Sequence, residues 1–119
     1  MFENMTPIRK NGARPCMTVT SDHIQFNKGC ADEIKGQLFN CFYDSDRKLF
    51  ALQGSDERNR DSYCFGNKTF AIIRSRQVME SIGEMITLDI PDGKTLKVYG
   101  TYIPQEDGLV FNMTQGRLV

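Results

Sequence analysis

Four cysteines and a single histidine are the residues of this chain best suited to bind a metal ion or to form a nucleophile with its base. Cys16, Cys30, Cys41 and Cys64 are spaced 14, 11 and 23 residues apart, and His23 is the only histidine. A structural zinc site usually contains a close ligand pair such as Cys-x-x-Cys, which these spacings do not provide. A catalytic thiol or hydroxyl needs a positioned base, and His23 lies in a segment expected to be a strand. We therefore expect no metal, no cofactor and no catalytic residue, and we expect all four cysteines to be small buried hydrophobic residues.

The remaining sequence also lacks the patterns of common enzymes. The phosphate-binding motif G-x-x-x-x-G-K-[ST], the dinucleotide motif G-x-G-x-x-G and the hydrolase motif G-x-S-x-G are all absent. The carboxylate pairs 32–33 and 106–107 are adjacent in sequence, so on a helix they point apart and in a turn both are exposed. Asp44 and Asp46 are explained by hydrogen bonding within a turn. The sequence thus predicts a protein that is not an enzyme.

Basic side chains are concentrated locally, although the chain as a whole has 15 Lys+Arg and 15 Asp+Glu. Residues 1–15 hold three bases and one acid, and a second basic stretch precedes a predicted helix. A helix start beside arginines suits a phosphate, because free backbone N–H groups and basic side chains converge there. Ordinary solvated surface charge is the alternative interpretation. The candidate contacts to nucleic acid or to a partner are Arg9, Lys10, Arg14, Lys28, Lys68, Arg74 and Arg76.

Length and composition indicate one globular domain. The chain has 119 residues, of which 39% are hydrophobic and 25% charged, as is usual for such a domain. No segment approaches the roughly 18 apolar residues that a membrane span requires, so we expect no membrane association. The first residues also lack the apolar core of a secretory signal, and we expect a cytoplasmic protein with reduced thiols.

Apolar periodicity and turn residues predict mainly strands, with two short helices. Asn27 is expected to cap a helix over 28–35 that ends at Gly36, and Ser75 to cap a second helix that ends at Gly83. The segments 38–43 and 49–52 predict a β-hairpin around a polar turn, followed by a polar loop over 53–61. Further strands are expected at 17–20, 23–26, 69–73, 86–90, 96–100 and 109–113.

The same order of signals occurs twice, with a shift of 48 residues. This shift aligns the cap Asn27 with Ser75, the apolar Ile34 with Ile82, and the two predicted hairpin turns. One such unit is too small to bury a core alone, whereas two interleaved units can close a barrel and hide their strand edges. The expected fold is α+β and mainly β, a small barrel of two pseudo-repeated strand-helix-hairpin units over 16–52 and 62–113. Residues 1–15 are expected to form a basic arm, 16–113 the single domain and 114–119 a tail.

The strand 23–26, the helix ending at Gly36 and the hairpin 38–52 together resemble the AbrB swapped-hairpin unit. Duplication of this unit in one chain is similar to cradle-loop barrels. The resemblance implies DNA binding, and it leaves open a homodimer. AbrB-type proteins carry arginines around the loop between strand and helix. Here Lys28 stands at that place in the first unit, and Arg74 and Arg76 in the second.

The whole chain also resembles small proteins of Firmicutes mobile elements. The residues that carry this resemblance are Arg14-Pro15, Ile24-x-Phe26-Asn27, Phe50-Ala51-Leu52 and 108–112. It implies a phage or conjugative-element setting and no particular reaction.

These observations lead to two main hypotheses of function. The first is an AbrB-like DNA-binding module that contacts phosphates through the basic residues named above. The second is an inhibitor carried by a mobile element, an anti-CRISPR or other anti-defence protein, which binds a host nucleoprotein effector. Its acidic C-terminal third, with five acids against three bases over 83–119, would then face the effector. A small enzyme on the same barrel is a third alternative.

Overall fold

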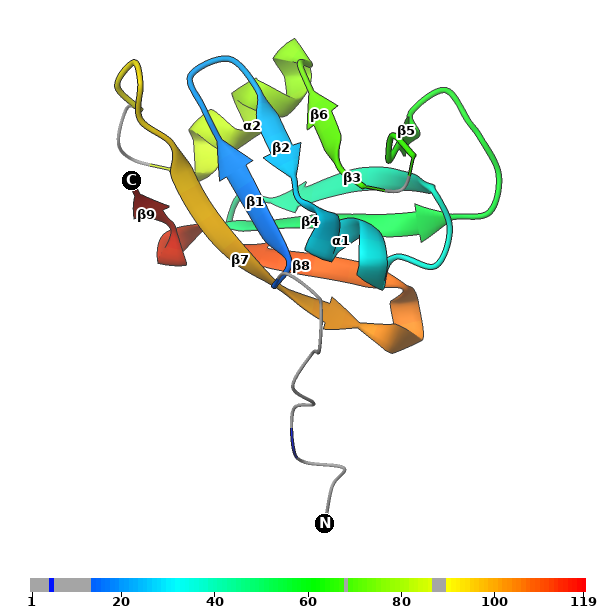
Figure 1. The fold of residues 1–119 in the computed structure, drawn as a ribbon. Coiled ribbons are helices and arrows are strands. Elements are labelled where there is room, and N and C mark those ends of the chain that lie inside the picture. The colour runs from blue at the N-terminus through cyan, green and yellow to red at the C-terminus, as the bar shows by residue number, and fades with distance from the viewer. Residues whose placement is uncertain (1–4, 6–13, 68, 87–89) are drawn as a thin grey trace.

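The computed structural model describes residues 5, 14–67, 69–86 and 90–119, which form an antiparallel sheet with two α-helices (Figure 1). The strands are β1 (Cys16–Val19), β2 (Ile24–Phe26), β3 (Leu38–Asp44), β4 (Leu49–Ser55), β5 (Tyr63–Cys64), β6 (Ala71–Ile73), β7 (Leu96–Ile103), β8 (Gly108–Asn112) and β9 (Arg117–Leu118). The helices are α1 (Lys28–Glu33) and α2 (Arg76–Met85), with 3-10 turns η2 (Pro104–Glu106) and η3 (Met113–Gln115).

The sheet curls into a nearly closed barrel. Its strands pair in the order β5-β3-β4-β8-β7-β1-β2-β6, and β9 adds to β7. The two edge strands, β5 and β6, follow each other in the chain, and Gly66 pairs with Phe70 in the segment between them. The predicted fold class, mainly β with a small barrel and two short helices, is confirmed at this level.

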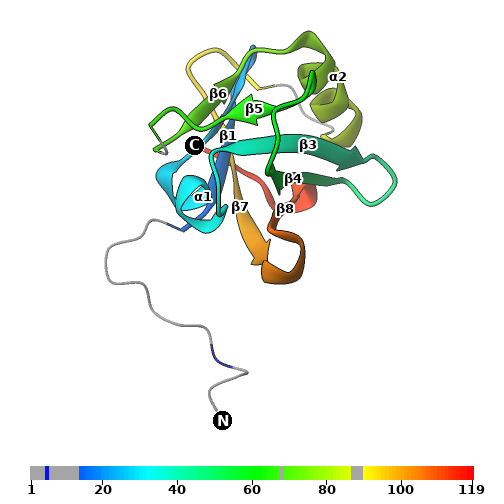
Figure 2. The same ribbon diagram turned by 90° about the vertical axis from the view of Figure 1, so that its right-hand side faces the viewer.

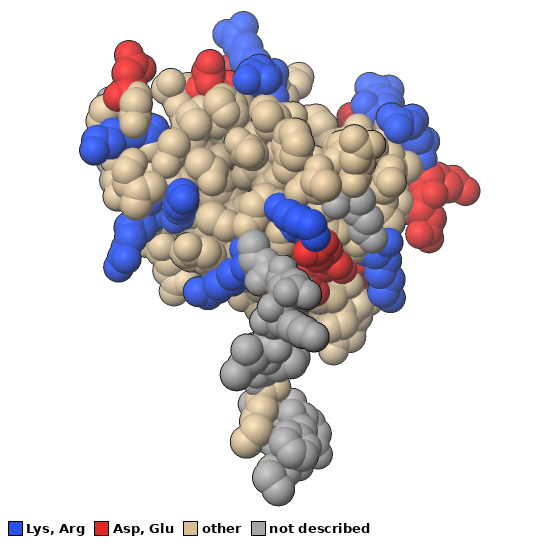
Figure 3. All heavy atoms as spheres, viewed as in Figure 1, with Lys and Arg blue, Asp and Glu red and all other residues tan. Residues whose placement is uncertain are grey.

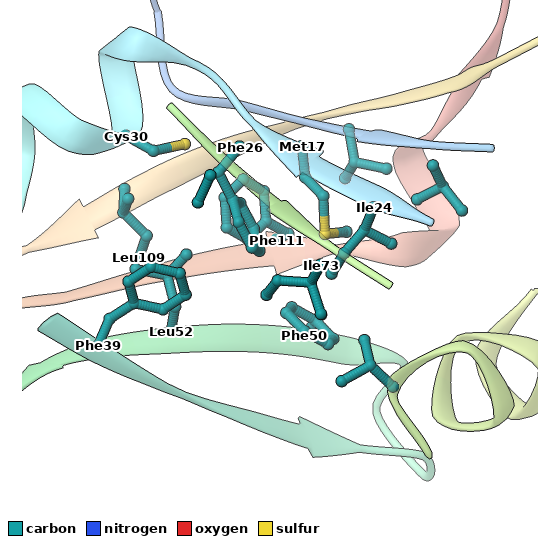
Figure 4. Close-up of a cluster of buried hydrophobic side chains, with 14 of the residues drawn as sticks. Met17, Ile24, Phe26, Cys30, Phe39, Phe50, Leu52, Ile73, Leu109 and Phe111 are labelled. Carbon is teal, nitrogen blue, oxygen red and sulfur yellow. The ribbon is translucent and has the colours of Figure 1, made fainter. Parts of the chain in front are cut away.

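Four phenylalanines from different walls of the barrel meet at its centre (Figure 4). The ring of Phe26 on β2 lies 5.7 Å from that of Phe39 on β3, 6.1 Å from that of Phe50 on β4 and 5.7 Å from that of Phe111 on β8. All four are fully buried or nearly so. Gly100 on β7 makes room for this cluster, because a Cβ there would lie 2.6 Å from the Phe111 ring.

The two helices cover opposite ends of the barrel (Figures 1 and 2). The predicted caps are both present: Asn27 accepts a hydrogen bond from Cys30 N, and Ser75 accepts one from Val78 N. Beyond α1, Ile34 is completely buried and its Cγ2 lies close to Gly54. At the other end, α2 buries Val78, Ile82 and Met85.

Both helices end differently from the prediction. Helix α1 stops at Glu33, before Gly36, because Ile34 adopts an extended backbone and turns its side chain into the core. Helix α2 continues past Gly83 to Met85. Gly83 lies on the exposed side, where its low helix propensity of about 1 kcal/mol is outweighed by the burial of Met85 on the apolar side.

Two other segments also differ from the sequence-based boundaries. Strand β4 runs to Ser55, so part of the loop expected over 53–61 is paired with β3 and β8. Residues 117–118 of the expected tail form β9 against β7. Most of the strand expected over 86–90 lies outside the described residues.

The tip of the β7–β8 hairpin fastens the end of the barrel that α1 covers. Asp107 adopts a left-handed backbone, with φ of 48°. Its Oδ1 accepts hydrogen bonds from Lys35 N at 3.1 Å and from the Tyr102 hydroxyl at 2.7 Å, and its carbonyl accepts one from Gly54 N at 2.8 Å. One residue thus joins the segment after α1 to β4 and β7. Burial, together with the bond to Asp107, raises the pKa of Tyr102 to about 12.

Replacement of Ile34 or Ile82 by alanine tests the two helix-covered ends. Because both side chains are buried, we expect each substitution to lower the free energy of unfolding by about 2–4 kcal/mol. Chemical denaturation measures this change. Asp46→Ala and Lys94→Ala, at exposed turn positions, serve as controls and should lower it by about 0.5 kcal/mol or less. A large difference between the two isoleucines would contradict the equivalence of the ends.

The contact between Tyr102 and Asp107 predicts a loss of stability at high pH. Between pH 10, the ordinary pKa of tyrosine, and about 12 the folded protein keeps a phenol proton that the unfolded chain has released. The free energy of unfolding should therefore fall as the pH rises through this range. Tyr102→Phe should show a smaller fall in denaturation experiments at several pH values. An identical pH dependence in both proteins would contradict this role of Tyr102.

Candidate functional site

One outer face of the barrel presents a continuous row of side chains across five strands. Pairing joins Ile72 on β6 to Gln25 on β2, Gln25 to Thr18 on β1, Thr18 to Lys97 on β7, and Lys97 to Arg117 on β9. We call these five residues the outer row. Each member on β6, β2, β1 and β7 lies between two buried neighbours on its own strand, and successive side chains of a strand point to opposite faces. The outer row therefore faces solvent.

The outer row ends in two positive charges placed directly opposite each other. Lys97 and Arg117 are cross-strand partners, and both side chains are exposed. Within the described part of the chain, no acidic side chain forms an ion pair with either of them. Like charges at opposed positions destabilise a sheet, and an anion bound between them would remove this repulsion.

Tyr99 continues the same face of β7, two residues beyond Lys97. Its side chain is 50% exposed, and the guanidinium of Arg14 lies over its ring, 4.6 Å from the centroid. Such a cation–π pair holds a positive charge on an aromatic surface. Two further basic groups thus flank Cys16, since Lys97 and Arg14 both partly offset the rise in the pKa of that thiol, which burial causes.

Asn27 fixes the backbone that carries Arg14. The Asn27 Nδ2 donates to the Arg14 carbonyl at 2.8 Å, while its Oδ1 accepts from Cys16 N at 3.0 Å and from Cys30 N at 3.2 Å. In addition, Gly100 N donates to the Pro15 carbonyl at 2.9 Å. The helix cap read from the sequence therefore also anchors the chain where it enters the barrel.

The basic residues predicted from the sequence are distributed over different parts of the structure. Arg14 lies on the face of the outer row, and Lys28 lies close to it, next to Asn27. Lys28 forms an ion pair with Asp32 at 3.0 Å, and Arg76 forms one with Glu80 at 3.1 Å, so an acid partly neutralises each charge. Arg74 is exposed at the opposite end of β2 and β6, near Asp22. Arg9, Lys10 and Lys68 lie outside the described residues.

The surface charge of this face agrees with the placement of these residues. Figure 3 shows the face in the orientation of Figure 1, and Lys and Arg side chains are spread over its left half, where β7 and β1 run. The acidic side chains of that half lie at its upper edge. The local charge is therefore positive although the chain as a whole has a formal charge of zero.

The cysteines provide no activated thiol at this face. Burial raises the pKa of Cys16, and it raises the pKa of Cys30 and of Cys41 to about 12, whereas a reactive thiol needs a lowered pKa. Cys16 and Cys30 are buried as predicted, Cys41 is partly buried and Cys64 is exposed. The prediction of four buried cysteines was wrong for Cys64, because β5 is a two-residue edge strand with a solvent-facing side.

His23 belongs to a turn and is not within a strand, as the sequence had suggested. Its Nδ1 lies 2.6 Å from Asp22 Oδ1 and 2.9 Å from Thr20 Oγ1. The hydrogen bond to His23, followed by that to Thr20, lowers the pKa of Asp22. In a catalytic triad the acid and the hydroxyl contact different ring nitrogens, so this arrangement is explained as a turn between β1 and β2. Among the described residues, no group of three or more metal-ligating side chains is close enough to hold a metal ion.

A second outer face, formed by β3, β4 and β8, is apolar. Phe42, Ala51 and Val110 are successive cross-strand partners, and the Phe42 side chain is 53% exposed. They border a shallow hollow of about 240 Å³ that also includes Ile103 and Glu106. The barrel thus has one basic face and one apolar face with an acidic margin.

Sequence reasoning missed the three residues that give the basic face its character: Lys97, Tyr99 and Arg117. The alternation Leu96-Lys97-Val98-Tyr99 could have placed Lys97 and Tyr99 together on the outside of a strand. Nothing local marks Arg117, since its position depends on pairing with β7 some twenty residues earlier in the chain.

Comparisons of the chain with protein-family models, with curated proteins and with solved structures found no match. None of the helices in the described part of the chain has the length and apolar character needed to span a bilayer.

Proposed function

We propose that this protein is a non-enzymatic binding module that contacts the phosphate backbone of nucleic acid through the face of the outer row. The observation that carries this proposal is the opposed pair of Lys97 and Arg117, which repel each other and have no acidic partner among the described residues. Phosphate oxygens are the anions that such paired basic groups suit best. Arg14 extends the positive region along β7.

The DNA-binding hypothesis from the sequence is kept in this proposal, with a changed set of contacts. Arg14 remains a central contact, and Lys28 and Arg74 lie at the margins of the face. Lys97 and Arg117 are added. A phage or mobile-element setting and a cytoplasmic location remain part of the proposal, and they rest on the sequence alone.

The proposal includes a duplicated strand-helix-hairpin unit of AbrB-like type. Its support is the antiparallel pairing of β2 with β6, the two strands that precede the helices. Ile24 pairs with Ile73, and Gln25 pairs with Ile72. A shift of 48 residues exchanges these two pairs, as a two-fold axis between the strands requires. Strand β8, which lies between β4 and β7, is the element that such a pseudo-symmetry leaves without a counterpart.

A second candidate function is that of an inhibitor that binds a host effector protein, as an anti-defence protein would. The apolar face favours it, because Phe42 is a half-exposed aromatic beside a hollow, and aromatic side chains are enriched at protein interfaces. Glu106, at the margin of this hollow, supplies the acidic character that was expected of such an inhibitor. The two functions therefore differ in the surface that carries them.

Salt-dependent binding tests the first function. Labelled oligonucleotides are titrated with the protein at several salt concentrations, and binding is followed by fluorescence anisotropy. We expect the affinity to fall steeply with salt. The double variant Lys97→Ala/Arg117→Ala should bind more weakly and reduce the slope of log affinity against log salt by about 2, because each phosphate contact contributes about 1.

Arg60→Ala is the matched control, since Arg60 is exposed in the loop between β4 and β5, away from the outer row. This variant should leave the slope unchanged. Absence of binding to any nucleic acid at low salt, where phosphate contacts are strongest, would overturn the proposed function.

A further inference from the structure

We infer that the nucleic acid bound by this face is single-stranded, with a phosphate between Lys97 and Arg117 and an unpaired base stacked on Tyr99 and Arg14. This inference rests on the proposed function and adds the class of ligand. It combines two neighbouring features, a cationic pair without an acidic partner among the described residues and a half-exposed aromatic ring with a guanidinium above it.

The spacing of the two features suits one nucleotide. Lys97 and Tyr99 are two residues apart on β7 and point to the same side of the sheet. Two residues of an antiparallel strand span about 6.8 Å. A phosphate held at Lys97 therefore leaves its own or the adjacent base within reach of Tyr99.

Stacking on this ring requires a base that is not part of a duplex. In double-stranded DNA the faces of the bases are covered by their neighbours, and a protein reads their edges through an element that enters a groove. The face of the outer row consists of sheet strands, and its aromatic group lies in the plane of contact. Proteins that bind single strands combine such an aromatic surface with a cationic track for the backbone.

The row itself allows the strand to continue past the first nucleotide. From Lys97, the chain of cross-strand partners leads through Thr18 and Gln25 to Ile72, which is 41% exposed. These side chains offer hydrogen-bonding groups and an apolar surface, without an acidic group that would repel the backbone. A bound strand would cross β7, β1, β2 and β6 approximately at right angles.

The test compares a labelled 12-nucleotide poly-dT strand with a duplex of the same length, both at low salt, by fluorescence anisotropy. We expect the single strand to bind at least tenfold more tightly. Tyr99→Ala should weaken its binding about 5- to 100-fold, which is the loss of one stacked base, and Tyr99→Phe should bind as the unchanged protein does. Because Tyr99 is half exposed, both variants should fold, and thermal denaturation checks that they do.

The outcomes separate this inference from the proposed function. Equal or tighter binding of the duplex, or an unchanged affinity of Tyr99→Ala for the single strand, would overturn the single-strand inference and leave phosphate binding intact. Loss of binding in Lys97→Ala/Arg117→Ala together with an unaffected Tyr99→Ala has the same meaning. If neither oligonucleotide binds to the unchanged protein, both the inference and the proposed function fail.

Discussion

The closure of one sheet around Phe26 is the constraint on which the rest of the structure depends. Its ring contacts phenylalanines from β3, β4 and β8, so β2 is held against the far wall of the barrel. A strand of three residues cannot be stable by its own pairing. The aromatic contacts hold it in the wall, and the helices that follow β2 and β6 cover the two ends of the core. A small domain can in this way bury a core of its own.

The surface chemistry follows from the same closure. Once Met17, Phe26 and Val98 point inward, the pleat forces Thr18, Gln25 and Lys97 outward on three adjacent strands. A shift of one residue in any of these registers would bury the polar side chains and expose the apolar ones. The core therefore fixes the alignment of the basic face, although none of its residues touches a ligand there. The apolar face around Phe42 is determined in the same manner by the register of β3 and β4.

Local signals in the sequence identified what depends on neighbouring residues. The caps Asn27 and Ser75 and the β3–β4 hairpin are set by a few adjacent side chains, and the structure contains all of them. Features that depend on distant partners were not predicted. Arg117 lies opposite Lys97 only because β9 pairs with β7, and the hydrogen bonds of Asp107 join segments that are far apart in the chain. The candidate site was consequently predicted only in part, since Arg14 was found and the pair opposite it was not.

The central claim is that ligand binds on the face of the outer row, and amide chemical shifts measure this most directly. In a titration of the isotopically labelled protein with a single-stranded oligonucleotide, the account predicts shifts at Thr18, Gln25, Lys97 and Tyr99. The amides of Ala51 and Val110, on the apolar face, should remain unchanged. Shifts confined to the apolar face, or no shifts at a concentration of oligonucleotide well above that of the protein, would contradict it.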